Sequence, residues 1–460
     1  MDEREATLAS YNAGVAEYLR LTPEEPSALA FWLGAMVGDV FSPGARVWEI
    51  GSAGGQDARH LRECGLEVLA SDAATAFVDH LHGNGFPDAF RYDLQVDEPP
   101  VSDVDIVFAN AVLPHLRRED VGPALARLQS ALGDDVVLFA SVKLGDGEGW
   151  STEKLSGPRW YTYWQPEEFT RVLQASGWVV EEARARAGRY DDWLAVIALP
   201  VRSALRDAFD ERAASYCRSD FHRIHAERLV ENTPLSPGST VVDAAAGTGF
   251  VARAVGRRIG PDGRVIAVDL SEGMLQSLVS GDDVDAAPIE VVVGDATELG
   301  LPDGGVDTVL CGGGLLYMDV DRALAEWRRV LAPGGVVAFS TMAADNPPPA
   351  LLFRVHARGY GLDLPDPYAP LGTAEACAAA LERAGFVEVD VVEGEVPLSD
   401  RDLDQTWEVY QRMARHDLAT LPEADVWRLR ASYVAEMTLR SRSEPEFRTA
   451  QALYATGRRP

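Results

Sequence analysis

An internal repeat constrains this chain more than any other feature. One set of landmarks occurs in the first half and returns in the same order about 200 residues later. Tyr11 and Tyr18, in an amphipathic opening segment, correspond to Phe209 and Tyr216, and a Pro-Gly turn follows each pair. A repeat with the period of a whole domain predicts two folded copies, and 460 residues exceed what one hydrophobic core usually supports. The expected domains are residues 1–200 and 201–460.

Strands and helices alternate in both halves. A β-branched strand ends in a carboxylate, Glu49 or Asp243, and a turn rich in glycine and alanine leads from it into a helix. The second strand also ends in an acid, Asp72 or Asp269. Because strands that alternate with helices usually pair in parallel, we predict an α/β fold of two tandem Rossmann-like domains. Each is expected to hold a mostly parallel, doubly wound sheet with helices on both faces.

Three stretches do not fit the minimal repeat unit. They are the aromatic run Lys143–Trp164, the proline-rich run Ala343–Pro370 and a helical insertion at about residues 400–440. Loops on a rigid scaffold carry specificity, so we expect all three to act as lids over a substrate pocket. Within the first run, Trp160–Trp164 would either clamp a flat or cationic substrate or form the core beneath the lid.

The turn after the first strand indicates the cofactor. It lacks the G-x-G-x-x-G pattern of a nicotinamide site, which brings the backbone close to a pyrophosphate. Here a carboxylate ends the strand, and small residues follow at alternate positions in both halves. A carboxylate suits a positively charged ligand without pyrophosphate, and S-adenosylmethionine carries an ammonium and a sulfonium. Small side chains let the backbone approach that ligand.

Further acids complete the expected cofactor site. Asp72 and Asp269 are placed to accept hydrogen bonds from ribose hydroxyls, and Asp93 and Asp295 from an adenine amino group. The expected contacts in the first half are Tyr11, Glu49, Gly51, Gly55, Asp72, Asp93 and Asn110. Those in the second half are Tyr216, Asp243, Ala245, Gly247, Gly249, Asp269, Met274, Asp295, Ala296 and Cys311.

The second half resembles class I methyltransferases of the ubiquinone and menaquinone C-methylation type and their secondary-metabolite relatives. The resemblance covers roughly residues 205–340 and rests on four segments: Phe209–Tyr216, Val242–Gly249, Val268–Met274 and Trp327–Gly335. The first half is similar to a more distant class I methyltransferase through Glu49–Ser52, Ser141–Lys143 and Tyr161–Trp164. It has Ala53 where many relatives have glycine, and its third acid lies in Tyr92-Asp-Leu94 instead of Gly-Asp-Ala. The resemblance implies a class I methyltransferase fold and S-adenosylmethionine as the cofactor, and it does not extend to the substrate. Our first hypothesis is methyl transfer to a small molecule, with both domains acting on one scaffold at two positions or successively on one atom.

Few catalytic residues are needed for this chemistry. Displacement at a sulfonium requires alignment and, for hydroxyl or amine acceptors, a base. The segment after the fourth strand usually borders the methyl group in this fold, which makes His115 a candidate base; a surface or helix-capping role is the alternative. Tyr317 would steer a substrate hydroxyl or pack beneath the adenine. His222 lies on the segment expected to cover the second cofactor pocket, where it is either catalytic or part of a polar helix face.

Charge and composition limit the partners. The net charge of −30 repels phosphate backbones, so we expect no nucleic-acid partner. The four cysteines have no metal-binding spacing, and we expect no metal. No apolar run reaches membrane-spanning length and the amino terminus does not resemble a signal peptide, which predicts a cytoplasmic protein without a membrane partner. The oligomeric state is open, a homodimer included.

Three other functions fit the same landmarks. Only the second domain would be catalytic if the first were a degraded copy that serves as a scaffold. A peptide or protein would be the substrate if the acidic surface recruited a basic tail. A cofactor-binding regulatory module without catalysis would also retain these acids, and cofactor turnover separates it from the enzymes.

Overall fold

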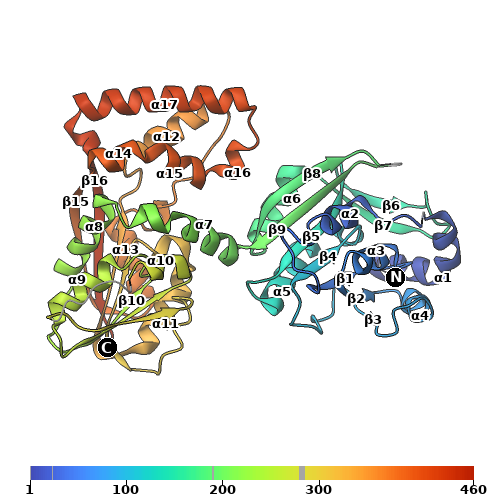
Figure 1. Ribbon diagram of the computed structural model, residues 1–460, viewed down its shortest axis with the longest axis horizontal. Helices are drawn as coiled ribbons and strands as arrows, with labels where there is room; N and C mark the ends of the chain where they lie inside the picture. The colour runs from blue at the N-terminus through green and yellow to red at the C-terminus, as the bar shows by residue number, and fades with distance from the viewer. Residues whose placement is uncertain (1, 23, 189–190, 279–284) are drawn as a thin grey trace. The chain divides into compact units, whose positions relative to one another are not determined.

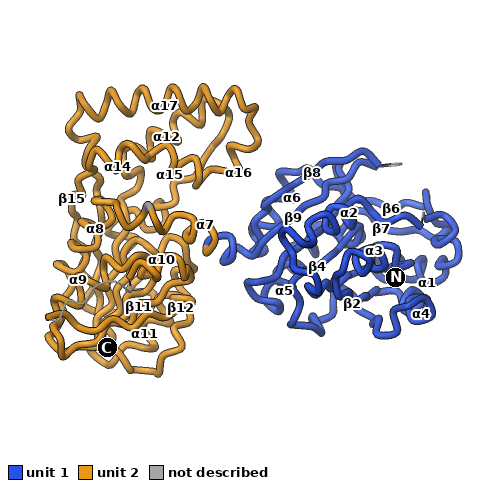
Figure 2. The backbone as a smooth tube through the Cα atoms, viewed as in Figure 1, with its two compact units in different colours: residues 1–205 blue, residues 206–460 orange. Residues whose placement is uncertain are grey.

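The structure is a computed structural model that describes residues 2–22, 24–188, 191–278 and 285–460. The chain forms two compact units, Met1–Leu205 and Arg206–Pro460 (Figure 2). We call them the first and the second unit.

The first unit is built on a mostly parallel sheet (Figure 1). Five strands lie parallel in the order β3-β2-β1-β4-β5, and β9 pairs antiparallel with β5 and with β8. The strands are β1 (Arg46–Ile50), β2 (Glu67–Asp72), β3 (Phe90–Arg91), β4 (Ile106–Ala109), β5 (Val137–Leu144), β8 (Trp178–Arg186) and β9 (Trp193–Pro200).

Helices cover both faces of this sheet. Side chains of a strand alternate between its faces, so Val47 packs in one buried cluster with α2 and α3, and Trp48 packs in another with α5 and α6. The helices are α1 (Glu3–Leu21), α2 (Ala28–Gly34), α3 (Gln56–Glu63), α4 (Thr75–Gly83), α5 (Arg118–Leu132), α6 (Pro166–Ala175) and the short 3-10 helix η1 (Leu113–His115).

The aromatic run Lys143–Trp164, which we expected to be a loop, is regular secondary structure. It forms the end of β5 and an antiparallel hairpin of β6 (Glu148–Ser151) and β7 (Arg159–Trp164). Aromatic and β-branched residues favour strands, which accounts for the difference. Trp164 is fully buried against Phe169, so this end of the run is core and takes no part in a clamp.

The second unit repeats the strand order of the first. Its sheet runs β12-β11-β10-β13-β14-β16-β15, with β16 antiparallel to both neighbours. The prediction of two tandem, mostly parallel α/β sheets is confirmed. The strands are β10 (Thr240–Ala244), β11 (Arg264–Asp269), β12 (Ile289–Val293), β13 (Val306–Gly312), β14 (Leu331–Met342), β15 (Val387–Pro397) and β16 (Thr449–Arg458).

Two groups of helices belong to the second unit. The first group flanks the sheet: α7 (Val201–Tyr216), which begins in the first unit, α8 (Asp220–Glu231), α9 (Phe250–Ile259), α10 (Glu272–Gln276), α11 (Val320–Val330), α13 (Ala374–Arg383) and the 3-10 helices η2 (Leu315–Tyr317) and η3 (Ala369–Leu371). The second group, which we call the lid helices, is α12 (Pro348–Arg358), α14 (Asp400–Asp404), α15 (Thr406–Met413), α16 (Arg415–Leu418) and α17 (Glu423–Ser443), and η4 (Pro445–Arg448) follows it. The lid helices gather at one end of the unit around their own buried cluster, which includes Phe353, Leu429 and Tyr433 (Figure 1). Among the described residues, no helix combines the length and the apolarity needed to cross a bilayer.

Candidate cofactor and acceptor sites

The turns after β1 and β10 have the same backbone conformation. Each contains three residues with positive φ at matching positions, a conformation that side chains larger than glycine disfavour. Alanine replaces glycine at one position of each turn, and both alanines keep the left-handed conformation. The matching residues are Gly51 (76°), Ala53 (45°) and Gly55 (74°) in the first unit, and Ala245 (58°), Gly247 (54°) and Gly249 (81°) in the second.

The second acid of each unit holds this turn in place. One oxygen of Asp72 accepts a hydrogen bond from the Ala53 amide at 2.9 Å, and one oxygen of Asp269 accepts from the Gly247 amide at 2.7 Å. Ala53 therefore makes the contact that glycine makes in the other copy. Each carboxylate oxygen retains a lone pair for a ribose hydroxyl. Burial raises the pKa of Asp72 to about 6 and also raises the pKa of Asp269.

The first acid of each unit has a buried oxygen without a partner. Glu49 is 3% exposed and Asp243 is fully buried. Asp243 Oδ2 accepts from the Ala252 amide at 2.8 Å, whereas Asp243 Oδ1 and Glu49 Oε2 have no hydrogen-bond partner among the described residues. Burial raises the pKa of both carboxyls to about 8. Because an unpaired buried carboxylate is costly, the ammonium of S-adenosylmethionine fits this position in both units.

The first helix of each unit is held in place by a hydrogen bond that occurs at the same position in both units. We did not predict this contact from the sequence. Asn12 of α1 accepts a hydrogen bond from the Ala76 amide at 3.0 Å, and Asp210 of α7 accepts from the Gly273 amide at 2.9 Å. These two residues directly follow Tyr11 and Phe209, so the repeat itself carried the signal. In the second unit the Tyr216 ring lies beside the turn, 3.8 Å from where a β-carbon on Gly247 would be.

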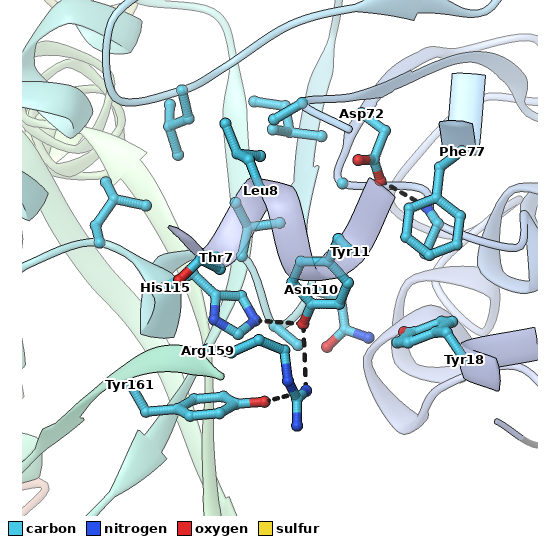
Figure 3. A pocket seen from close by; sticks show the side chains of 18 of the residues that line it. Thr7, Leu8, Tyr11, Tyr18, Asp72, Phe77, Asn110, His115, Arg159 and Tyr161 are labelled. Atoms are coloured by element: carbon cyan, nitrogen blue, oxygen red, sulfur yellow. Dashed lines mark hydrogen bonds between the residues drawn. The ribbon is translucent and has the colours of Figure 1, made fainter. Parts of the chain in front are cut away.

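The first unit contains a cavity of about 510 Å³ beside the turn (Figure 3). Six predicted residues line it: Tyr11, Gly51, Asp72, Asp93, Asn110 and His115. Asp93 forms an ion pair with Arg4 of α1 at 2.8 Å, and Asn110 accepts a hydrogen bond from Ser141 at 2.7 Å. Glu49 and Gly55 lie outside the lining, and a β-carbon on Gly55 would meet Leu81 at 2.9 Å.

His115 and Tyr11 form a hydrogen-bonded pair in this cavity. His115 Nδ1 lies 2.8 Å from the Trp160 carbonyl oxygen, which can only accept, so Nδ1 carries the proton. Nε2 is therefore the acceptor for the Tyr11 hydroxyl at 2.8 Å (Figure 3). Burial lowers the pKa of His115 to about 3, which keeps the ring neutral.

Three cations, of which sequence reasoning selected none, surround this pair. Arg159 is 1% exposed, and it donates to Tyr161 Oη at 2.6 Å and to Tyr11 Oη at 3.5 Å (Figure 3). Its Nε has no hydrogen-bond partner, and no carboxylate of the described residues forms an ion pair with it. Lys154 lies 4.0 Å from the ring centroid of Tyr18 and also lacks an ion pair in the described chain, whereas Lys143 is paired with Asp191 at 2.5 Å.

The second unit contains a cavity of about 540 Å³ under the lid helices. Its lining is rich in aromatic and proline side chains, among them Tyr216, Phe221, His222, Tyr317, Pro347, Pro349, Phe353, Tyr368 and Tyr410. It also includes three arginines and three acids: Arg212, Arg354, Arg412, Asp402, Glu408 and Asp417. Both predicted catalytic residues, His222 and Tyr317, line it. The His222 ring lies 4.0 Å from that of Tyr216. His225 is turned away, buried against Tyr454.

Other predicted residues of the second unit lie within its core. Met274, Ala296 and Cys311 are almost completely buried, and burial raises the pKa of Cys311 to about 12. Their side chains fill the core, so any contact with a cofactor is left to their backbones. Asp295 accepts a hydrogen bond from the Thr297 amide at 2.7 Å. The described residues contain no cluster of three or more His, Cys, Asp or Glu that would hold a metal ion.

Comparisons with known proteins agree with this geometry. Family models described as a methyltransferase domain match residues 23–183 and 242–339. A ubiquinone/menaquinone biosynthesis C-methyltransferase of Bordetella avium is 38% identical over 135 residues, which are 28% of this chain and 51% of the relative. Nocamycin O-methyltransferase of Saccharothrix syringae is 26% identical over 283 residues, 54% of this chain and 96% of the relative. The chain thus spans about half the length of the first of these relatives.

One solved structure can be aligned with almost the whole chain. Phosphoethanolamine N-methyltransferase 2 of Haemonchus contortus, determined with S-adenosylhomocysteine, aligns with a TM-score of 0.34 and 14% identity over 94% of this chain and 99% of that chain. The matched family models, the repeated sheet order and the paired turns lead to one conclusion. The chain belongs to the S-adenosylmethionine-dependent methyltransferases and carries two methyltransferase domains of this family in tandem.

Proposed function

We propose that both units transfer a methyl group from S-adenosylmethionine to small molecules. The observation that carries this proposal is the repeated turn, with a partnerless buried carboxylate oxygen on Glu49 and on Asp243. Each turn belongs to a unit with a cavity of about 510 or 540 Å³, a size typical of small-molecule sites. Such volumes favour a small acceptor over a peptide. The turn of the first unit keeps its geometry although Ala53 stands where the second unit has glycine. This favours two catalytic units over one catalytic unit with the first unit as a scaffold.

In the first unit, Tyr11 and His115 would remove the proton of the acceptor. The bound cofactor supplies an electrophilic methyl group on a sulfonium, and its leaving group needs no proton. The Tyr11 hydroxyl donates to His115 Nε2. When the Tyr11 oxygen takes the proton of the acceptor, its own proton can therefore pass to Nε2. The Trp160 carbonyl holds the opposite side of the ring and stabilises the imidazolium that forms.

The acceptor of the first unit would carry an anionic group. A guanidinium as buried as Arg159 is costly without a counter-anion. Burial and the neighbouring Arg159 and Lys143 lower the pKa of Lys154 to about 8, and a bound anion would relieve this repulsion. The carboxylate of the cofactor is a less suitable partner for Arg159. Both units would bind the same cofactor, but the described residues of the second unit form no hairpin between β14 and α13 that corresponds to β6–β7. A carboxylate, sulfate or phosphate monoester on the acceptor fits this site.

In the second unit, His222 would be the base and the acceptor would be largely apolar. The aromatic and proline side chains of the cavity suit a flat, uncharged ring system. Burial lowers the pKa of His222 to about 3, so its ring is neutral and one ring nitrogen is unprotonated, although the same burial weakens it as a base. The names of the secondary-metabolite and quinone methyltransferases among the relatives are consistent with such a substrate.

Calorimetric titration with S-adenosylhomocysteine tests the proposal. The intact chain should bind two equivalents; Asp72→Ala should weaken the first site and Asp269→Ala the second, each by about 1–3 kcal/mol, the value of a charged hydrogen bond. Asp88→Ala and Asp262→Ala remove exposed carboxylates and serve as controls. Circular dichroism establishes that each variant is folded.

The three possible results separate the alternatives. Two sites that respond each to its own variant support two working units. A single site that responds only to Asp269→Ala would make the first unit a scaffold. No binding at all would refute the proposal for both units.

A further inference from the structure

A chain of hydrogen bonds connects the candidate base of the second unit to the lid helices. Ser219 is the N-cap of α8, and its hydroxyl donates to Asp402 Oδ1 at 2.8 Å, although 183 residues separate the two in sequence. His222 Nδ1 lies 2.8 Å from the same hydroxyl oxygen. Asp402 belongs to α14, the first helix of the insertion between β15 and β16, and forms the capping box of that helix with Ser399.

These contacts fix the protonation state of the imidazole. The Ser219 proton is directed to Asp402, so Ser219 Oγ can only accept from His222, and Nδ1 must carry the ring proton. Nε2 is then the unprotonated nitrogen. It has no hydrogen-bond partner in the described part of the chain, and His222 lines the cavity. The lone pair of the base is therefore available to an acceptor.

The same hydrogen bonds link the position of His222 to the packing of α14 on α8. Asp402 Oδ2 accepts from the Phe221 amide at 3.2 Å, so the same carboxylate fastens α14 to the first turn of α8. Without Asp402, the Ser219 hydroxyl would be free to donate to Nδ1. The ring proton would then move to Nε2, where it blocks proton acceptance.

We propose that Asp402 and Ser219 are positioning residues that hold His222 with its proton on Nδ1, so that the base of the second unit forms only when α14 is seated on α8. This inference rests on the proposed function for the role of His222. When the acceptor loses its proton, Nε2 receives it, and the imidazolium is stabilised through Nδ1, Ser219 and the Asp402 carboxylate.

Nitrogen NMR of the intact chain labelled with ¹⁵N-histidine tests this directly. The two neutral tautomers give distinct ¹⁵N shifts and couplings, and loss of one signal set in His222→Gln assigns the residue. We expect the unmodified chain to show His222 with its proton on Nδ1. Ser219→Ala and Asp402→Ala should move that proton mainly to Nε2. The conservative substitution Ser219→Thr keeps a hydroxyl and should therefore retain the proton on Nδ1.

A matched variant separates positioning from lid stability. Asp400→Ala removes an exposed carboxylate of the same helix that pairs with Arg448 and does not contact Ser219. It should leave the His222 tautomer unchanged. An Nε2 proton in the unmodified chain would overturn the inference even if every variant failed to fold. Unchanged signals in folded Ser219→Ala and Asp402→Ala would overturn it as well.

The experiment is independent of methyl transfer. The tautomer is read without cofactor, so a chain that fails to bind S-adenosylhomocysteine would refute the proposed function and leave the relay intact. A chain that binds cofactor but holds His222 in the other tautomer would refute the relay alone. Where an acceptor is known, Asp402→Ala should lower kcat of the second unit with little change in KM.

Discussion

The two units agree where they would meet the cofactor and differ where they would meet the acceptor. Their turns match in conformation position by position, and each leaves one buried carboxylate oxygen unpaired. The first cavity is closed by a hairpin that brings Arg159 and Lys154 to it, whereas lid helices and aromatic rings close the second. A shared ligand thus preserved one side of each site while the other side diverged. The two units would then act on chemically different groups, on separate molecules or at two positions of one scaffold.

Both candidate bases nevertheless follow one rule. In each unit a fixed partner holds the imidazole Nδ1, which leaves Nε2 as the unprotonated nitrogen. The Trp160 carbonyl of the hairpin holds His115, and Ser219, backed by the lid residue Asp402, holds His222. The same electronic arrangement has been reached with different structural elements.

Removing a base should have the largest effect and should stay within one unit. His115→Ala is expected to lower kcat of the first unit by about 10²–10⁴-fold, the usual contribution of general acid–base catalysis. Turnover by the second unit should be unchanged. In the Asp269→Ala background, at cofactor concentrations well below the weakened affinity of the second site, the formation of S-adenosylhomocysteine reports mainly on the first unit. Equal losses in both units would mean that the two sites are coupled, which would break the comparison.

Loosening the lid should affect the second unit alone. Leu429 is fully buried in the lid cluster, and Leu429→Ala should destabilise that cluster by about 2–5 kcal/mol. Trp427 lies on the same helix at 60% exposure, and Trp427→Ala is the control. Hydrogen exchange should accelerate in the lid helices and stay constant in the strands of the first unit. Unaltered exchange in the lid helices would show that their cluster does not maintain the lid.

The parts of these sites that could be read from the sequence are local. A carboxylate at the end of a strand, small residues at alternate positions and a second acid are adjacent in sequence, so the turns, the cofactor and the fold followed from spacing. The predicted roles of the individual site residues stay predictions. Met274, Ala296 and Cys311 share these segments, but their side chains point into the core.

The parts that the sequence did not reveal depend on tertiary contacts. Arg159 meets Tyr11 across 148 residues, and Ser219 meets Asp402 across 183. No local pattern marks either pair, because the hairpin and the lid helices bring them together only in the folded units. His222 and His225 are three residues apart on one helix, and only packing decides that the first faces the cavity and the second faces Tyr454.

Anion binding should distinguish the first cavity from the second. Inorganic phosphate should bind the chain already saturated with S-adenosylhomocysteine and raise its melting temperature. Arg159→Gln should weaken that binding by about 10- to 100-fold, the range of a charged hydrogen bond, and Arg171→Gln, at an exposed position on α6, should not. If S-adenosylhomocysteine instead displaces phosphate, the cations serve the cofactor carboxylate. The contrast between the two cavities would then lose its main support.

The smallest expected effect tests the similarity of the two turns. In the cofactor-free chain the pKa of Glu49 and of Asp243 is about 8, so both carboxyls are mainly protonated at pH 7. Pairing with the cofactor ammonium favours the ionised form, so binding should release up to about one proton per site. Affinity for S-adenosylhomocysteine should therefore rise by up to about fivefold from pH 7 to pH 8 and by about twofold more as the carboxyl becomes fully ionised above pH 8. Calorimetry in HEPES and in Tris, whose ionisation enthalpies differ, counts the protons, and Glu49→Gln or Asp243→Asn should abolish the release at its own site only. Proton release at one site alone would mean that the turns, despite their matching backbones, present different electrostatic environments to the same ligand.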